Sequence, residues 1–340
     1  MSPLRAEVIS IGDEMTSGVR LDTNSQWLSS RLGELGIEVA FHSTVGDNLA
    51  DNIDVFQHAV NRVEIVIVTG GLGPTADDLT RLAISKMADV PLVTRPEILA
   101  HIRSMFESRG REMPENNSIQ AEFPAGAAAI PNPEGTAPGI DFPTQAPNGK
   151  ACRIIALPGV PVEMKQMWFQ SVEASLKKQT GNLSIIHHHT LHCFGSGESH
   201  IESLLPNLIQ RGRDPQVGIT ASSATISLRV STNGSTKADC MNKMQPTIDT
   251  IRQTLGPLVF GENGTELQQV VHNLLTTQKQ KLAVIDAGLL GVVGQRLSQI
   301  PGSKKLICAN ETLEQMPEPN EIENIIESSG ATLGIAIGPI

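Results

Sequence analysis

The chain has 340 residues, a mass of 36.4 kDa and a formal net charge of −10 at pH 7. This length exceeds what one hydrophobic core usually organises, so we expect two or three domains. The acidic balance argues against direct binding of nucleic acid, which needs a basic patch, and no run approaches the roughly 20 apolar residues that span a bilayer.

The start of the chain, MSPLRAEVIS, lacks the basic and apolar segments of a secretory signal, which predicts a cytoplasmic protein. The cysteines are scattered without C-x-x-C spacing, which argues against a disulfide framework or a zinc knuckle; they are Cys152, Cys193, Cys240 and Cys308. An anionic small molecule could still bind through backbone amides and a metal ion.

The first half alternates β-branched apolar runs with helical patterns, which is typical of a parallel sheet with helices on both faces. The expected elements are strand 6–11, helix 24–35, strand 38–45, helix 49–62, strand 64–69, helix 78–87 and strands 127–130 and 153–157. Asp47 or Asn48 should cap the helix at 49–62. Residues 124–150 are dense in Pro, Gly and Ala, which predicts a loop region with one short strand. The motif LPGVPVEM then begins a helix with Pro161 in its first turn.

The pattern changes near residues 179–182. The expected elements there are strand 184–193, helix 199–209, strands 217–221 and 225–231, and helix 237–254, which together form a small α+β unit. The strand with His187, His188 and His189 is expected at the surface, because consecutive residues point to opposite faces and cannot all share a metal. A third segment begins near Glu266 and ends on a strand pattern. The predicted domains are residues 1–178, 179–260 and 261–340.

Acidic residues follow three of the expected strands. Asp13 and Glu14 follow the first, Asp47 follows the second, and Asp77 and Asp78 follow the third. In an open parallel sheet, ligands bind outside the carboxyl ends of the strands. One Gly-Asp after a strand is most often a turn or a helix cap, and that interpretation stays open for Asp47 and Asp77. The coincidence of three such sites at one edge indicates a ligand site.

The run TGGLGPTADD, residues 69–78, combines glycines with aspartates. Its glycines allow amides to point at phosphate oxygens, although a tight turn is the alternative. Carboxylates beside a phosphate would repel it unless a divalent cation lay between them. Arg81, one helical turn after Asp78, could pair with that carboxylate or reach a phosphate.

Five motifs, in order, carry a resemblance to a known family: GDEMTSGVRLDTNSQWL, TGGLGPTADDLTR, RGREMPENNSIQA, NPEGTAPG and LPGVPVEM. Residues from about 5 to 170 thus resemble the N-terminal domain of the CinA family, competence/damage-inducible protein A, whose fold is that of the molybdopterin-binding proteins MoaB and MogA. FGSGESHIESLL and ATISLRVST resemble the family's KH-like linking domain. The resemblance implies an α/β protein: a three-layer αβα domain with a mostly parallel sheet, a small α+β KH-like domain and a truncated α/β C-terminal domain.

The resemblance implies an ADP-ribose pyrophosphatase, a hydrolase that forms AMP and ribose 5-phosphate with Mg²⁺, Mn²⁺ or Co²⁺. Carried over by position, the catalytic residues would be Asp13, Asp47 and Asp78, and the metal-binding residues Asp13, Glu14, Asp47, Asp77 and Asp78. The substrate-binding residues would be Gly12, Asn24, Thr69, Gly70, Gly71, Gly73, Thr75, Arg81, Asn116, Gln120, Asn132, Gly135, Ala137, Pro138 and Gly139. Asn117 also lies in a matching motif. Asn116 and Gln120 are four apart on an expected helix, so they would share a face, although a solvated polar face is the commoner explanation of such a pattern.

The C-terminal segment departs from the family. Many members carry a domain that deamidates nicotinamide mononucleotide with the serine of AESCTGG. This chain has AVIDAGLLGVVGQRLSQIPGS from residue 283, with Ala287 in the place of that serine and a shortened stretch after it. Alanine cannot attack a carbonyl, so we predict a degenerate domain without deamidase activity. Its apolar residues are expected in the core rather than on a contact surface: Leu289, Leu290, Val292 and Val293.

Two alternatives to hydrolysis stay open, because a fold does not determine a function. One is molybdopterin binding or adenylyl transfer, and the other is a non-catalytic nucleotide-binding scaffold. The expected partner is a small nucleotide substrate, with no direct nucleic acid and no membrane. A homodimer is the commonest default for such a protein.

Overall fold

The computed structural model describes residues 4–181, 185–210, 212–222 and 224–338. The chain divides into two compact units, residues 1–187 with 232–242 and residues 188–231 with 243–340. In the described residues, no helix is both long enough and apolar enough to cross a membrane.

A six-stranded sheet forms the centre of the first unit, in the order β2-β1-β3-β8-β7-β6. Its strands are β1 (Arg5–Ile11), β2 (Glu38–Val45), β3 (Ile65–Thr69), β6 (Ala128–Ile130), β7 (Gly139–Gln145) and β8 (Ala151–Leu157). β1 pairs in parallel with β2 and β3, and β3 with β8, whereas β7 runs antiparallel to β6 and β8. The expected mostly parallel sheet is confirmed.

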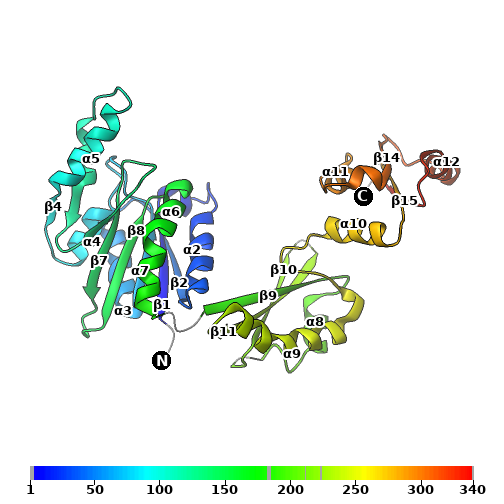
Figure 1. Cartoon of the computed structure of the whole chain (residues 1–340), viewed down its shortest axis with the longest axis horizontal. Helices are drawn as coiled ribbons and strands as arrows, with labels where there is room; N and C mark the ends of the chain where they lie inside the picture. Colours follow the sequence, from blue (N-terminus) through cyan, green and yellow to red (C-terminus); the bar gives the residue numbers. More distant parts are fainter. Residues whose placement is uncertain (1–3, 182–184, 211, 223, 339–340) are drawn as a thin grey trace. The chain divides into compact units, whose positions relative to one another are not determined.

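Helices cover both faces of this sheet, as Figure 1 shows: α3 and α4 on one side, and α2, α6 and α7 on the other. They are α2 (Thr23–Glu34), α3 (Leu49–Arg62), α4 (Thr80–Met87), α6 (Pro161–Met167) and α7 (Glu173–Thr180), with a π turn, η2 (Trp168–Val172), between the last two. The fully buried β3 alternates between two cores. Val66 and Val68 pack in the core that contains Phe56 of α3, and Ile65 and Ile67 pack on the opposite side.

The parallel pairing brings the ends of three strands to one edge of the sheet. Ser10 is level with Thr69, and Ile11 is level with Val45. The residues after these positions therefore meet at one place. The short helix α1 (Asp13–Thr16) follows β1, and α3 follows β2. Asn48 is the cap of α3, because the Asn48 side chain accepts hydrogen bonds from two amides of the first turn of α3.

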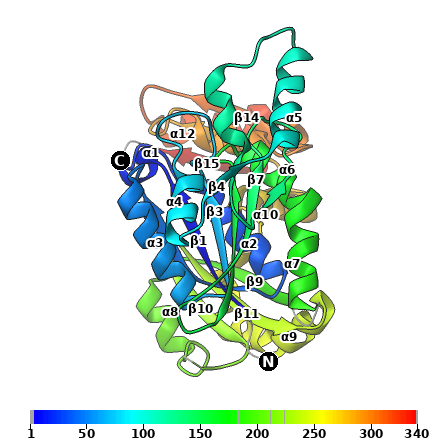
Figure 2. The same ribbon diagram turned by 90° about the vertical axis from the view of Figure 1, so that its left-hand side faces the viewer.

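Residues 92–150 contain more structure than expected. They form β4 (Leu92–Thr94), α5 (Pro96–Glu107), the 3₁₀ helix η1 (Glu115–Ala121) and β5 (Glu122–Pro124) besides β6 and β7. The prediction of one short strand at 124–150 is wrong because β7 tolerates Pro143 within a strand, where proline usually argues against one. Helix α5 projects from the sheet in Figures 1 and 2.

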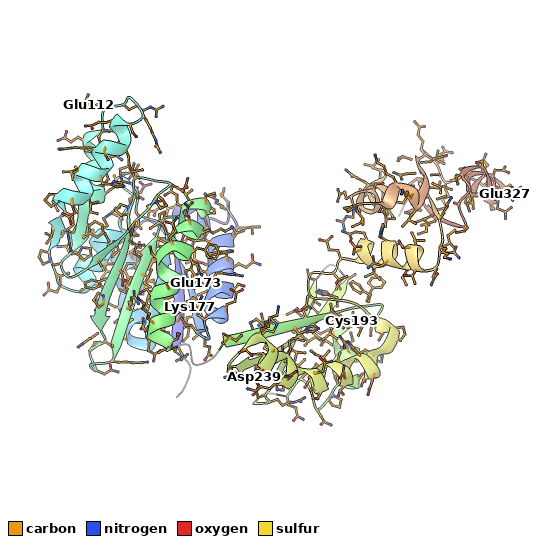
Figure 3. The ribbon with its side chains drawn as sticks, viewed as in Figure 1. Glu112, Glu173, Lys177, Cys193, Asp239 and Glu327 are labelled. Carbon is orange, nitrogen blue, oxygen red and sulfur yellow. The ribbon has the colours of Figure 1, made fainter. Side chains whose placement is uncertain are left out.

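Aromatic contacts join α2 to the turn after α6. The Trp27 ring meets Trp168 edge-on at 5.9 Å between centroids and Phe169 at 5.6 Å. Trp168 is fully buried. On α7, which follows in the chain, Lys177 forms an ion pair with Glu173 one turn earlier at 2.5 Å, and Figure 3 labels both residues.

A four-stranded sheet, in the order β10-β11-β9-β12, forms the middle of the chain. Its elements are β9 (Ile185–Phe194), α8 (Glu198–Leu204), β10 (Gln216–Ser222), β11 (Thr225–Gly234), α9 (Lys237–Leu255), the 3₁₀ turn η3 (Gly256–Leu258) and β12 (Val259–Glu262). The expected α+β composition is confirmed. The expected surface strand is wrong for His189, which is buried and lies 2.7 Å from Glu262, itself paired with Arg252.

The C-terminal segment contains a parallel three-stranded sheet in the order β14-β13-β15. Its elements are α10 (Leu267–Thr277), β13 (Leu282–Asp286), α11 (Val292–Ser298), η4 (Ser303–Lys305), β14 (Ile307–Thr312), α12 (Pro319–Ser329) and β15 (Leu333–Ile337). Two residues expected in the core are at the surface, since Leu290 is 91% exposed and Val292 is 42% exposed. Leu290 also has a left-handed φ of 54°.

Candidate functional site

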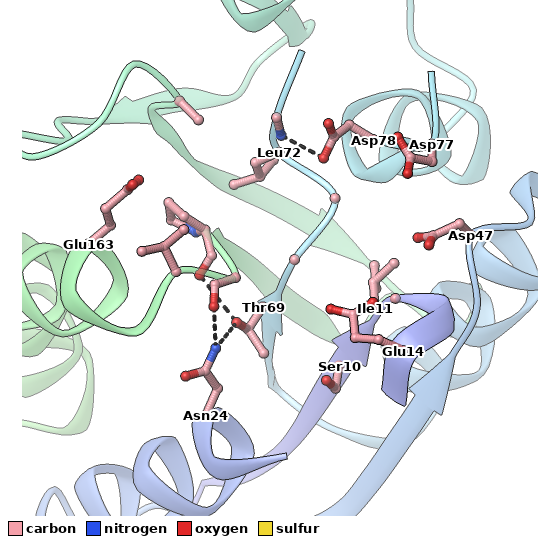
Figure 4. Close-up of a pocket in the computed structure, with 18 of the residues that line it drawn as sticks. Ser10, Ile11, Glu14, Asn24, Asp47, Thr69, Leu72, Asp77, Asp78 and Glu163 are labelled. Carbon is pink, nitrogen blue, oxygen red and sulfur yellow. Dashed lines mark hydrogen bonds between the residues drawn. The ribbon is translucent and has the colours of Figure 1, made fainter. Parts of the chain in front are cut away.

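A cavity of about 520 Å³ opens at the carboxyl edge of the six-stranded sheet (Figure 4). It is lined by Ser10, Ile11, Gly12, Glu14, Met15, Arg20, Asn24, Asp47, Thr69, Gly70, Gly71, Leu72, Gly73, Pro74, Asp77, Asp78, Gln120, Thr136, Ala137, Pro158, Gly159, Val160, Pro161 and Glu163. Residues from all three predicted strand ends therefore reach one cavity.

Residues 70–73, here called the glycine turn, pass close to neighbouring backbone. Gly70 has a φ of 109°, and a side chain there would meet the carbonyl oxygen of Ile11 at 2.3 Å. Gly71 has a φ of 65° and lies against the hydroxyl of Thr80, which donates to the Gly70 carbonyl at 2.9 Å. Only glycine fits both positions, because side chains are excluded by space and by φ.

The amides of the glycine turn divide into two groups. The Gly70 amide donates to Leu157, and the Gly73 amide donates to the carboxylate of Asp78 at 2.7 Å. Among the described residues, no acceptor is found for the amides of Gly71 and Leu72. Those two amides are therefore the ones that could bind an anion.

The carboxylate of Asp78 closes the glycine turn. Its carboxylate accepts from the Gly73 amide, from the Thr75 amide at 2.9 Å and from the Thr75 hydroxyl at 2.5 Å. These three bonds close the loop from residue 73 to residue 78. Thr75 does not line the cavity, since its donors are turned toward Asp78.

Arg81 does not reach the cavity, which corrects the expectation that it contacts a phosphate. It is 4% exposed, and its guanidinium donates to the carbonyls of Leu72 and Gly73. Burial lowers its pKa to about 10, although the charges of Asp78 and Glu122 act to raise it. Arg81 therefore holds the glycine turn from behind.

Asp13 and Asp47 form a reciprocal pair at the ends of β1 and β2. Each backbone amide donates to the other's carboxylate at 3.0 Å. Asp47 lines the cavity and Asp13 does not. Burial raises the pKa of the Asp47 carboxyl, and the charges of Asp13, Asp77 and Glu14 raise it further against the lowering effect of the Asp13 amide. The charged carboxylates of Asp13, Asp77 and Glu14 therefore lie near enough to Asp47 to act on it.

Asn24, at the start of α2, fixes the floor of the cavity. Its side-chain amide donates to the Thr69 hydroxyl at 3.0 Å and to the Gly159 carbonyl at 2.8 Å. The Thr69 hydroxyl in turn donates to the Pro158 carbonyl at 3.2 Å. Figure 4 shows this chain of bonds, which joins α2, β3 and the loop before α6.

Glu163, in the first turn of α6, lines the cavity and was missed as a site residue. Its carboxylate accepts from the side chain of Asn132 at 2.7 Å. Asn132 also donates to the Ala137 carbonyl and accepts from the Gly135 amide, so it orders the loop over Glu163 without lining the cavity. Glu163 belongs to the LPGVPVEM motif, which begins at Leu157, where β8 ends. An acidic residue soon after a strand end, in a segment with proline and glycine, is the sequence pattern that could have identified it.

The segment around η1 corrects the expectation that Asn116 and Gln120 share a helix face. Because η1 is a 3₁₀ helix, residues three apart share a face. Buried Asn117 accordingly donates to Gln120 at 2.9 Å, whereas Asn116 is exposed and outside the cavity. Gly139 begins β7, where a side chain would meet the Ala156 carbonyl at 2.7 Å.

The structure brings most of the predicted site together. The predicted residues that line the cavity are Gly12, Glu14, Asn24, Asp47, Thr69, Gly70, Gly71, Gly73, Asp77, Asp78, Gln120 and Ala137. Those that do not are Asp13, Thr75, Arg81, Asn116, Asn132, Gly135, Pro138 and Gly139. Some lining residues were not predicted as site residues. One of them, Arg20, is the one cationic side chain in the described lining of the cavity.

The donor set suits a cation that is shared with a ligand. In the part of the chain that the structure describes, no group of three or more His, Cys, Asp or Glu residues forms a ready-made metal site. Mg²⁺ commonly uses only one or two carboxylates, with phosphate oxygens and water completing its shell. Burial is the main reason that the pKa of Asp47 is raised, and the charges of Asp13, Asp77 and Glu14 add to it; a bound cation would offset both effects. One or two of Glu14, Asp47 and Asp77, which line the cavity, fit this role.

Comparison with known proteins places these features in a family. Residues 7–178 match the model of a probable molybdopterin binding domain, and residues 188–261 match that of the damage-inducible protein CinA KH domain. A protein of Halothermothrix orenii named for competence-damage induction is 40% identical over 298 residues, which are 88% of this chain and 70% of that protein. A CinA-like protein of Dictyoglomus thermophilum is 36% identical over 96% of this chain and 79% of its own length.

A solved structure, that of the protein CinA from Thermoplasma acidophilum, is 31% identical and covers 51% of this chain and 98% of its own, with a TM-score of 0.46. The identities and coverage of the sequence relatives, together with both family models, are sufficient to assign the family. The chain belongs to the CinA family, with a MoaB/MogA-like molybdopterin-binding domain and a CinA KH domain.

Proposed function

We propose that the cavity hydrolyses the diphosphate of ADP-ribose, or of a related nucleotide, to AMP and ribose 5-phosphate with the help of a divalent cation. One observation carries the proposal: Glu14, Asp47 and Asp77 line the same cavity as a glycine turn in which two amides have no acceptor among the residues that the structure describes. Carboxylates can only accept hydrogen bonds or bind a cation, whereas free amides donate to anions. A diphosphate with a bound metal ion uses both kinds of group at once.

The chain's own residues would divide the work. The amides of Gly71 and Leu72 would bind diphosphate oxygens, while Asp78 and Arg81 keep the turn in shape. One or two of Glu14, Asp47 and Asp77 would hold the cation, which would supply charge neutralisation and a lowered pKa for bound water. Asn24 would keep the floor of the cavity fixed beneath the reacting group.

The test is incubation of the protein with ADP-ribose and Mg²⁺, Mn²⁺ or Co²⁺, followed by measurement of AMP. Asp47→Asn should lower turnover on the order of 100-fold, because it removes a charge that faces the cavity but keeps a side chain of the same size. Asp51→Asn is the matched control, since Asp51 is an exposed acid in the first turn of α3 outside the cavity. Absence of AMP with all three metals would overturn the proposal.

Molybdopterin binding or adenylyl transfer is the second candidate. It is favoured by the match of residues 7–178 to a probable molybdopterin binding domain. Tight binding of molybdopterin without release of AMP from ADP-ribose would support this candidate. Binding of ADP-ribose without turnover would instead support a nucleotide-binding scaffold.

A further inference from the structure

The cavity has two separate acidic positions. The charges that act on Asp47 are those of Asp13, Asp77 and Glu14, and Glu163 is not among them. Figure 4 shows Glu163 on the opposite side of the glycine turn from Asp47 and Asp77. Glu163 therefore does not belong to the group that would share a cation, and it needs its own explanation.

The carboxylate of Glu163 is held in one place. Asn132 donates to its Oε2 at 2.7 Å, and a side chain at Gly135 would lie 2.3 Å from the same oxygen. The loop of residues 132–137 thus covers one side of the carboxylate and leaves no room for a side chain there. Among the described residues, no lysine, arginine or histidine forms an ion pair with Glu163, so its charge is not neutralised by the protein.

A fixed carboxylate in a cavity selects for donors. It accepts hydrogen bonds only, so it repels phosphate and attracts hydroxyl or amino groups. The adjacent hydroxyls of a ribose are such donors, and acidic side chains commonly recognise them in nucleotide sites. A ligand whose diphosphate lies at the glycine turn carries a ribose next to that diphosphate.

We propose that Glu163, positioned by Asn132, accepts hydrogen bonds from the adjacent hydroxyls of a substrate ribose and makes the site specific for ribonucleotides. This inference rests on the proposed function only in that the cavity takes a ribose-bearing phosphate. Glu163 is a specificity-determining residue that contacts the sugar and does not contact the bond that breaks. The cavity consequently has a phosphate side at Asp47 and a sugar side at Glu163.

The experiment measures binding by calorimetry with the full chain and Mg²⁺, so it does not depend on turnover. Two pairs of ligands are compared, AMP with 2′-deoxy-AMP and ribose 5-phosphate with 2-deoxyribose 5-phosphate. At least one pair should show a preference of about tenfold or more for the hydroxylated ligand, as expected for a hydrogen bond to a charged group. Glu163→Ala should reduce that preference to about twofold or less.

The ratio separates recognition from folding, because a merely structural defect weakens both members of a pair alike. Glu173→Gln, on α7 and outside the cavity, is the matched control and should keep the wild-type ratio. The inference is overturned if neither pair is discriminated, or if Glu163→Ala keeps the discrimination. AMP and IMP, which differ in the amino group of the base, are compared as a third pair. The inference is also overturned if Glu163→Ala alters only the preference for AMP over IMP, since the carboxylate would then bind the amino group of the base. Discrimination without release of AMP from ADP-ribose would leave this inference standing while the proposed hydrolysis fails.

Discussion

Asp47 connects the electrostatics of the cavity to the stability of the fold. Its pKa is raised from the ordinary value of 3.8. A carboxyl with a raised pKa stabilises the folded state below that ordinary value, and this contribution is lost as the pH rises through the raised pKa. At neutral pH the charged Asp47 is therefore unfavourable for folding.

Asp47→Asn should accordingly increase the free energy of unfolding at pH 7, and the gain over wild type should shrink as the pH falls and vanish below 3.8. Urea denaturation at several pH values measures this. Asp51→Asn serves as the control with the opposite sign, because it removes a negative charge that favours the start of α3. A variant at Asp47 that is less stable than wild type at pH 7 would contradict the electrostatic argument.

Leu290 carries a backbone cost without a packing benefit. It has a φ of 54° and is 91% exposed, and left-handed backbone costs a non-glycine residue about 1 kcal/mol. Leu290→Gly should therefore raise the free energy of unfolding by about 1 kcal/mol, whereas Leu290→Ala should not. Chemical denaturation of the two variants decides the point, and equal stability of both would show that the turn is not strained.

The 3₁₀ helix η1 determines which polar side chain supports Gln120. Asn117→Ala removes a buried hydrogen bond and should cost about 1–3 kcal/mol. Asn116→Ala, one position earlier and exposed, should stay within about 0.5 kcal/mol of wild type. Denaturation gives the stabilities, and a larger loss at Asn116 would indicate an α-helical register instead.

The backbone amides of the turn after β13 already donate hydrogen bonds to the side chain of Asp286. The carboxylate of buried Asp286 accepts from the amides of Gly288, Leu289 and Gly291, and these bonds keep its pKa low. We expect no ammonia release from nicotinamide mononucleotide, because Ala287 lacks a nucleophile and the nearby amides are occupied. Ala287→Ser alone should not create the activity. Ammonia formed by the wild-type chain would show that another residue attacks the amide.

On the scale of the whole molecule, the cavity is local. All of its lining residues lie between Ser10 and Glu163. A fragment of residues 1–181 should therefore keep the ADP-ribose hydrolysis proposed for the full chain, with turnover within about threefold. Measurement of AMP release by both proteins tests this, and loss of activity in a folded fragment would mean that a later segment contributes to the site.

Much of the fold followed from local pattern. The bounds of β2 and α3 agree with the predicted ranges, because clear periodicity and a capping asparagine specify them. β7 was missed, since its pairing with β6 and β8 is a long-range interaction that overrides the local effect of Pro143. Local sequence cannot reveal such pairing.

The site divides in the same way. The meeting of Glu14, Asp47 and Asp77 followed from strand order alone, because parallel strands end at one edge. The separate tasks of Asp77 and Asp78 did not follow, since they depend on which carboxylate turns toward the Gly73 amide. Glu163 was overlooked because its partner, Asn132, is 31 residues away in the chain.

The contact between Trp27 and Trp168 has a practical consequence. The chain contains no tyrosine and only two tryptophans, and these two lie against each other. Trp27 belongs to α2, which supplies Asn24 to the cavity, and Trp168 directly follows α6, which supplies Glu163. The tryptophan fluorescence of this protein therefore originates at one contact, between two elements that each supply a residue to the cavity. Its emission can report ligand-induced movement there without any added dye.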